Sequence, residues 1–201
     1  MMVVEKGGAV PRRLDGERRA ELLDGVMRII AARGFAEVQV AEMARELHCS
    51  VATLYKIAPS KDSLVLLAIA RWGERTLKAL EIRAQQGATA SERARAYFRA
   101  GAESTHPLSL AFYADVERYE STRLAWWTGV VERYLARFVE LVQLAEDAAE
   151  IRPVNIRFFA EVLRGISFVT RSERVLSATG LTHEQAVLEV DSLLWDGIRL
   201  A

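Results

Sequence analysis

The polar side chains with the clearest chemical potential lie close together, between residues 50 and 61. This stretch holds the hydroxyls of Ser50, Thr53 and Tyr55 and the amines of Lys56 and Lys61. Hydroxyls that donate hydrogen bonds and amines that carry positive charge suit contact with phosphates and base edges. The sequence has no GxGxxG, GxSxG or HExxH pattern, so the common nucleotide-binding and hydrolytic motifs are missing. These residues therefore predict a binding surface rather than a catalytic centre.

Metal-binding residues are sparse. The chain has one cysteine, Cys49, and three histidines, His48, His106 and His183. A single cysteine excludes an internal disulfide and a cysteine zinc cluster, and the histidines are too far apart in sequence for a local metal motif. We therefore expect no metal and no cofactor. Cys49 falls on an apolar face, where we expect it to pack as a thiol rather than act as a redox sensor.

The composition indicates a globular protein with a substantial core. The 201 residues are 51% hydrophobic and 27% charged, and the net charge is zero. Zero net charge neither supports nor excludes a nucleic-acid partner, because phosphate contacts depend on which face carries the charges. The longest apolar run, residues 64–70, is far too short to span a membrane, and the N-terminus lacks the apolar core of a signal peptide. We expect a cytoplasmic protein without a membrane partner.

Apolar residues recur at helical spacing along the whole chain, which predicts an all-α fold. Gly34 suits the end of the first helix, because glycine accepts a left-handed backbone. Pro153 stops a later helix. The expected helices cover residues 15–33, 40–47, 51–57, 61–86, 91–104, a segment beginning at Pro107, 122–150, 154–171 and 182–199.

Residues 40–57 have the pattern of a helix-turn-helix. Two short helices that cross closely need a small residue at the crossing, and Ala44 fills that place. The turn needs a residue that tolerates positive φ; His48 stands there, and histidine is among the non-glycine residues that adopt it. Ser50 is well suited to cap the second helix. The inward-facing apolar residues are Met43, Leu47, Cys49, Leu54 and Ile57.

These residues resemble the TetR family of transcriptional regulators. Family members typically show Gly-Phe or Gly-Tyr after the first helix, then Thr-Leu-Tyr, an aromatic pair, and a Ser-Lys-Glu/Asp-x-Leu start to the fourth helix. This chain has the matching segments Gly34-Phe35, Thr53-Leu54-Tyr55-Lys56 and Ser60-Lys61-Asp62-Ser63-Leu64. The match covers about residues 18–66. The chain departs from the family pattern at His48, where glycine is usual, and at Ile57-Ala58, where the aromatic pair would brace the head against the fourth helix.

The resemblance implies a domain organisation and a function. It implies an arm over residues 1–14, a three-helix DNA-binding head over 15–60, and a helical effector-binding and dimerisation domain over 61–201. The implied function is that of a regulator, expected to be a repressor, which a small apolar or aromatic effector releases from a palindromic operator. Two alternatives stay open: an architectural DNA-binding dimer without a ligand, and a small helical enzyme.

The second helix of a helix-turn-helix lies in the major groove, where its early residues meet the base edges. The resemblance adds contacts with the DNA backbone from Tyr55 and Lys61 and from the start of the preceding helix. For Tyr55 the alternative is a half-buried packing role, and for the two lysines an ordinary solvated role. The expected DNA-binding residues are Gln39, Val40, Ser50, Val51, Ala52, Thr53, Tyr55, Lys56 and Lys61.

The C-terminal part supplies candidates for a ligand pocket and a dimer interface. Pockets between helices are mostly apolar, and the candidate lining residues are Trp72, Phe112 and Trp126. Two apolar stripes on the last helices could pair with the same stripes of a second subunit, with Gly165 permitting close approach. Burial within one subunit fits both the aromatics and the stripes equally well. The candidate interface residues are Phe158, Val162, Ile166, Val187, Val190 and Leu194.

Overall fold

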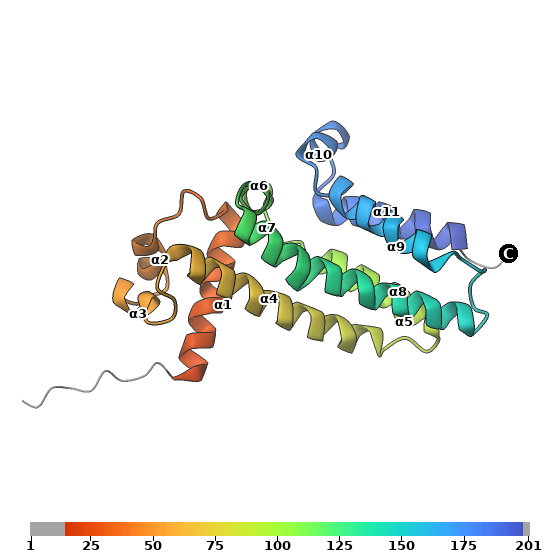
Figure 1. Cartoon of the computed structure of the whole chain (residues 1–201), viewed down its shortest axis with the longest axis horizontal. Coiled ribbons are helices and arrows are strands. Elements are labelled where there is room, and N and C mark those ends of the chain that lie inside the picture. The colour runs from red at the N-terminus through yellow and green to blue at the C-terminus, as the bar shows by residue number, and fades with distance from the viewer. Residues whose placement is uncertain (1–14, 199–201) are drawn as a thin grey trace, which may run out of the picture.

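A computed structural model describes residues 15–198; the predicted arm over residues 1–14 lies outside the described residues. All regular elements of residues 15–198 are helices (Figure 1). They are α1 (Gly16–Arg33), α2 (Val40–Glu46), α3 (Val51–Tyr55), α4 (Lys61–Ala84), α5 (Ala90–Ser104), α6 (Leu110–Arg118), α7 (Glu120–Trp126), the π-helical turn η1 (Trp127–Val131), α8 (Glu132–Asp147), α9 (Ile156–Val169), α10 (Glu173–Thr179) and α11 (His183–Ile198). The all-α prediction is confirmed.

The helices form an elongated body with a small head at one end (Figure 1). α1, α2 and α3 make the head, and α4 runs from it along the body, where α5 packs beside both α4 and α8. α9 and α11 lie over α5 and α8, and α10 sits at the end of this pair nearer the head. None of the described helices is long and apolar enough to cross a membrane.

Two apolar cores hold the molecule together. The first joins the head to the body, because Leu22 and Leu54 of the head belong to the same cluster as Leu64 of α4 and Phe112 of α6. The second fills the far end of the body between α4, α5, α8, α9 and α11. The head is therefore not an independent module: its core continues into α6 and α7, which places the head in contact with the body's own helices.

The observed helices differ from the expected ones in the second half of the chain. Pro107 does not open a helix; it lies in a turn, and α6 begins at Leu110 with Ser109 as its cap. The single helix expected over 122–150 is interrupted by the π turn η1. α10 was not expected, because its seven residues are too short for a clear apolar period. α11 begins with a capping box: the Thr182 N–H donates to Gln185 Oε1 at 2.9 Å, and the Gln185 N–H donates to Thr182 Oγ1 at 3.2 Å.

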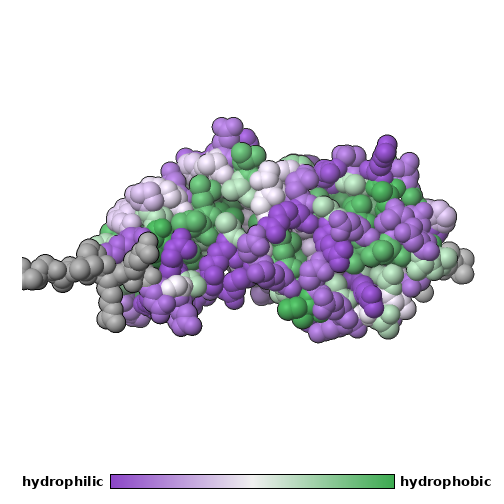
Figure 2. All heavy atoms as spheres, turned by 60° about the horizontal axis from the view of Figure 1, so that its bottom comes forward, coloured by the Kyte–Doolittle hydropathy of each residue, from purple (hydrophilic) through white to green (hydrophobic). Residues whose placement is uncertain are grey.

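Ion pairs fasten α1 and α8 to α4 on the surface. Asp24 binds Arg71 at 2.8 Å and Arg75 at 2.7 Å, and Arg137 binds Glu81 at 2.6 Å. The first pairing lowers the pKa of Asp24 through hydrogen bonds and charge, although partial burial opposes the shift. Hydrophilic side chains accordingly predominate along the middle of the face in Figure 2, with apolar areas between and beside them.

Candidate nucleic-acid interface and buried cavity

α2 and α3 form the helix-turn-helix that the sequence predicts. Ala44 is buried at the crossing, and His48 adopts a φ of 49° in the turn, as expected. The Ser50 hydroxyl caps α3 by accepting a hydrogen bond from the Thr53 backbone at 3.1 Å. Burial raises the pKa of the Cys49 thiol, which agrees with a packing role. The turn therefore has the geometry needed to hold α3 outward.

The outer side of α3 carries most of the predicted DNA-binding residues. Tyr55 is 47% exposed. Ala52 and Lys56 are also exposed, and Val51 and Thr53 are partly exposed. Thr53 Oγ1 shares a 2.8 Å hydrogen bond with Ser50 Oγ, so these two hydroxyls are ordered side by side. The helix thus presents a small polar surface that is not used by the core.

The structure separates two of the predicted contacts from this surface. The side chain of Val40 is buried in the first core, which leaves only its backbone near the exposed Gln39. The amine of Lys61 donates a 2.8 Å hydrogen bond to the Ala36 carbonyl and thereby holds the loop before α2. A contact of Val40 with DNA can therefore come only from its backbone, and Lys61 has a structural partner already.

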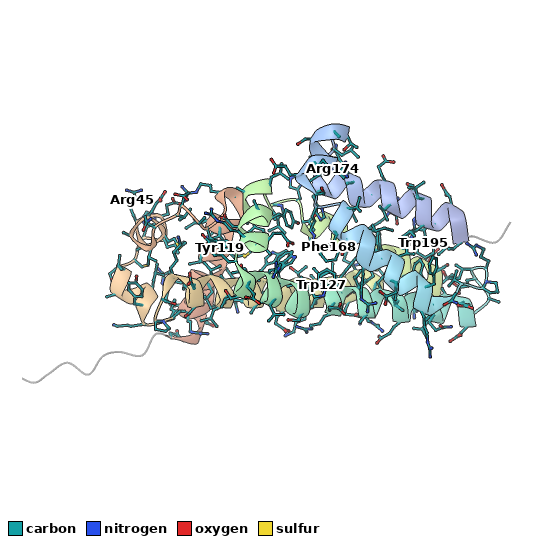
Figure 3. All side chains as sticks on the ribbon, turned by 45° about the horizontal axis from the view of Figure 1, so that its top comes forward. Arg45, Tyr119, Trp127, Phe168, Arg174 and Trp195 are labelled. Carbon is teal, nitrogen blue, oxygen red and sulfur yellow. The ribbon has the colours of Figure 1, made fainter. Side chains whose placement is uncertain are left out.

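The charge of α2 adds a candidate that the sequence reasoning missed. Arg33 binds both acids of α2, Glu42 at 2.9 Å and Glu46 at 2.7 Å, which raises the pKa of the arginine and neutralises those carboxylates. Arg45 on the same helix is exposed and takes part in no ion pair of the described residues; it extends from the tip of the head (Figure 3). The sequence does not show that Arg33 neutralises both acids of α2 while Arg45 stays exposed, so Arg45 could be identified only from the fold.

A carboxylate of α6 fastens the head to the body. Asp115 Oδ2 accepts hydrogen bonds from the backbone N–H groups of Phe35 and Ala36, at 2.5 and 2.8 Å. The Phe35 ring packs edge-on against Phe112, with centroids 6.3 Å apart, and against Tyr119 at 5.9 Å. Hydrogen bonds and ring contacts therefore join α6 directly to the loop between α1 and α2.

A mostly apolar cavity lies in the body behind this clamp. The space inside it, which includes solvent at its open mouth, is about 770 Å³. The candidates Trp72 of α4 and Trp126 of α7 line it, with their rings stacked at 5.3 Å. The third candidate, Phe112, does not line it, because that ring is fully buried in the first core. Tyr113, the next residue on α6, lines the cavity instead.

The two adjacent tryptophans have different surroundings. Trp126 faces the cavity, whereas Trp127 stacks on Phe168 of α9 with centroids 4.8 Å apart (Figure 3). Both belong to the segment where α7 passes into the π turn, and Val130 and Val131 of that turn also line the cavity. π turns inside helices are frequent at functional sites.

Polar groups gather at the cavity end nearest α9 and α11. The His183 Nδ1 lies 2.7 Å from the Thr170 carbonyl, which can only accept, so this nitrogen carries the proton. Tyr113 packs against the His183 ring at 5.0 Å, and Arg171 lines the same region. No three potential metal ligands come together anywhere in residues 15–198. The arrangement suits hydrogen bonding to a bound molecule.

We expect His183 to make stability dependent on pH. Burial lowers its pKa from 6.5 to about 4. Between pH 6.5 and about 4, His183 is protonated in the unfolded chain but neutral in the folded chain. The free energy of unfolding therefore rises with pH across this window and decreases as the pH falls. At pH 5 the loss relative to pH 7.5 is about 1 to 2 kcal/mol. Urea unfolding of wild type and His183→Gln at both values checks this: a variant with the same pH dependence as wild type would contradict it.

The last two helices divide the predicted interface residues. Phe158 on α9 is 69% exposed, and Leu193 on α11 is 75% exposed. Val187, Val190 and Leu194 instead pack on the second core of their own subunit. Their inward orientation follows from Asp191, whose fully buried carboxylate accepts hydrogen bonds from Arg99 at 2.8 Å and Arg95 at 3.2 Å.

Val162 and Ile166 are partly exposed, and Ile166 also lines the cavity. A Cβ atom added at Gly165 would meet no other atom within 4 Å in the subunit. Exposed or partly exposed residues with no polar side chain therefore occur on both of these helices: Phe158, Val162, Gly165 and Val169 on α9, and Leu193 on α11. We refer to these residues together as the α9–α11 face.

Comparisons with known proteins agree with this architecture. Residues 22–68 match the model of bacterial regulatory proteins of the tetR family. No curated protein matches the chain significantly. Solved structures with the same fold include one described as a transcriptional regulator from Saccharomonospora viridis in complex with choline, at a TM-score of 0.72 and 18% identity, covering 93% of this chain and 100% of that one.

Two further structures have the same fold. The fatty acid degradation regulator FadR from Bacillus halodurans has a TM-score of 0.68 and 17% identity, and the match covers 93% of this chain and 99% of that one. The ketosteroid transcriptional regulator KstR2 of Mycobacterium tuberculosis has a TM-score of 0.59 and 18% identity, with coverages of 94% and 98%.

Proposed function

We propose that this chain, whose residues 22–68 match the model of the tetR family of bacterial regulatory proteins, is a DNA-binding transcriptional regulator controlled by a small molecule. In this proposal a homodimer represses by binding a palindromic operator through α3 and releases it when an effector enters the body cavity. The observation that carries the proposal is that α6 holds both sites: Tyr113 lines the cavity, and Asp115, two residues away, clamps the head.

The DNA-binding step rests on the exposed surface of the head. Tyr55 and Lys56 on α3 are the best-placed side-chain contacts, and Arg45 on α2 adds a charge for a phosphate. The N-terminal half of α3 carries Val51 and Ala52, small enough for close approach to base edges and thymine methyl groups. Gln39, Ser50 and Thr53 complete the proposed contacts.

The proposed control of DNA binding by the effector depends on two contacts that connect the walls of the cavity with the head. One is the Asp115 clamp on the loop after α1. The other is the stack of Trp126 on Trp72, which belongs to α4, the helix that begins directly after the head. A ligand that displaces Trp126 or Tyr113 would move both connections. An effector can shift DNA affinity only as far as it binds the two arrangements differently, so this coupling is what the effector must exploit.

Dimerisation is proposed to use the α9–α11 face. Solvent-exposed apolar side chains that lie together mark an interface, and a two-fold pair of such faces would place two α3 helices on one side of the DNA. This face keeps Phe158 and Val162 of the interface expected from the sequence and leaves out Val187, Val190 and Leu194, which pack on the core of their own subunit.

We expect Phe158→Glu with Leu193→Glu to raise the dimer dissociation constant about 100-fold or more, because two charges from each subunit would have to be desolvated without partners. Sedimentation equilibrium measures the change. Both side chains are exposed within the subunit, so helicity by circular dichroism should not change. Ile82→Glu, at an apolar α4 residue that is also exposed, is the matched control and should stay dimeric. A double variant that remains dimeric would refute this interface.

The function is tested by selecting DNA from a pool of random duplexes with the full-length protein. We expect an inverted repeat whose half-sites are about one helical turn apart, since each subunit presents one reading helix. Recovery of single half-sites or of no consensus sequence would overturn the palindromic-operator proposal.

The main alternative is an architectural DNA-binding dimer without an effector. The cavity argues against it, because a structural role needs no space among the core aromatics. The names of the three solved structures with the same fold mention different small molecules: one is a complex with choline, and the other two are named after ketosteroid and fatty acid degradation. The family is a regulatory one, which also argues against the small helical enzyme.

A further inference from the structure

Three hydrogen-bond donors around the cavity are buried without a partner. They are Tyr113 Oη, Trp126 Nε1 and Arg171 Nη1, and all three residues line the cavity. Buried polar groups in folded proteins nearly always have partners. Three unpaired donors around one apolar space therefore indicate that a hydrogen-bond acceptor belongs there.

The positive charge of Arg171 indicates that this acceptor is an anion. Its Nε donates a 2.8 Å hydrogen bond to the Ser167 carbonyl, which fixes the guanidinium at the end of α9. Its guanidinium carbon lies 5.6 Å from the centroid of the Phe168 ring, but no carboxylate of residues 15–198 forms an ion pair with it, and Glu117 acts on it only from a distance. Burial lowers its pKa, yet an arginine side chain stays protonated in proteins. Water can satisfy the tyrosine and tryptophan donors, but it cannot balance a buried positive charge.

His183, which lies at the same end of the cavity, adds no second positive charge. His183 donates its Nδ1 proton to the Thr170 carbonyl and is neutral above the pKa of about 4 that burial gives it. Burial likewise keeps the Tyr113 hydroxyl protonated by raising its pKa. At neutral pH this end of the cavity therefore carries one net positive charge and several donors.

We propose that the effector is an apolar molecule with a single carboxylate, which pairs with Arg171 and accepts hydrogen bonds from Tyr113 and Trp126. This inference rests on the proposed function in taking the cavity as the effector site. The planar guanidinium matches a carboxylate, and one cation balances a monoanion better than a phosphate dianion. The rest of the ligand must be apolar, because Leu77, Leu80, Phe98, Leu135 and Leu163 form the far walls.

The length of the cavity selects a probe. Its α4 wall extends from Trp72 to Leu80, and the eight helical rises between these two residues span about 12 Å. A straight-chain acid such as decanoate fills a space of this length. 1-Decanol and decyltrimethylammonium have the same chain with a neutral and a positive head, so the three differ only in the group that meets Arg171.

The experiment measures binding of each probe to the full-length protein without DNA, by titration calorimetry below the micelle concentration. We expect decanoate to bind about ten-fold or more tightly than 1-decanol, and decyltrimethylammonium to bind most weakly. Arg171→Gln should abolish the preference for the acid while leaving decanol affinity within about two-fold. Tyr113→Phe, which removes one hydroxyl and keeps the ring, should reduce the preference partially and serves if Arg171→Gln fails to fold.

Equal affinity for acid and alcohol, or an unchanged preference in both variants, would overturn the inference, as would tightest binding of the cationic probe. Operator binding is measured separately with each probe. If decanoate binds with the expected preference but leaves DNA affinity unchanged, the switch fails and the ligand class stands. If 1-decanol or the cationic probe releases DNA and decanoate does not, the ligand class fails and the switch stands.

Discussion

Replacing Lys56 with glutamate should lower the affinity for the selected operator about 100-fold at low salt. The side chain is exposed at the end of α3 and takes part in no ion pair of the described residues, so its charge is free to meet a phosphate. The substitution removes one such contact per subunit and brings a like charge to the DNA. Because each neutralised phosphate contributes about 0.9 to the salt slope, the slope should fall by about 1.8 for a dimer.

Fluorescence anisotropy across a salt series measures both quantities. Lys78→Glu changes the net charge equally but lies far along α4, where the residue is exposed, and it is the matched control. If both variants lose affinity equally, the effect is one of overall charge, and α3 is not the reading helix. An affinity for Lys56→Glu within about three-fold of wild type would remove this residue from the interface.

Gly34→Ala should lower the free energy of unfolding by about 2 to 3 kcal/mol, because the backbone there has φ 75° and ψ −175°, a conformation that only glycine adopts without strain. A Cβ atom would also lie 2.5 Å from Asp115 Oδ2 and 3.0 Å from the Ala111 carbonyl, so the clamp on the head would have to shift. The substitution should therefore both destabilise the fold and change the position of the head relative to α6.

Chemical denaturation measures the stability, and hydrogen exchange at the Phe35 and Ala36 amides reports on the clamp. Gly16→Ala is the control, since an added Cβ there meets nothing within 4 Å and no positive φ is required. It should be neutral or stabilising by less than about 1 kcal/mol. Unchanged stability in Gly34→Ala would show that the loop relaxes without cost, contrary to this account.

The helix-turn-helix could be predicted because its signals are local. Ser50 caps the helix that it precedes, His48 adopts the positive φ that its place in the turn requires, and Ala44 is buried at the crossing. The missing aromatic pair was the open question, and the structure answers it. Ile57 and Ala58 are both buried, and Phe35 braces the head through Phe112 and Tyr119.

The site residues were predicted less well because their roles depend on contacts between distant segments. Asp115 and Phe35 are 80 residues apart. Periodicity marks Phe112 and Trp126 alike as apolar helix residues, and only packing decides that the first is core and the second lines the cavity. Arg171 was missed for the same reason: its sequence neighbours give no sign that its guanidinium is buried beside Tyr113 and His183. Val190 and Leu194 fit an interface stripe equally well until Asp191 fixes which face of α11 points inward.

Operator binding tests the central claim most directly. The measurement is fluorescence anisotropy of the full-length protein on the selected duplex and on a scrambled duplex of the same composition, from low to physiological salt. We predict saturation at one dimer per duplex and a preference for the selected sequence of at least about 1,000-fold, with both affinities falling as salt rises. Equal affinity for the two duplexes, or no binding even at low salt, would contradict a sequence-specific regulator.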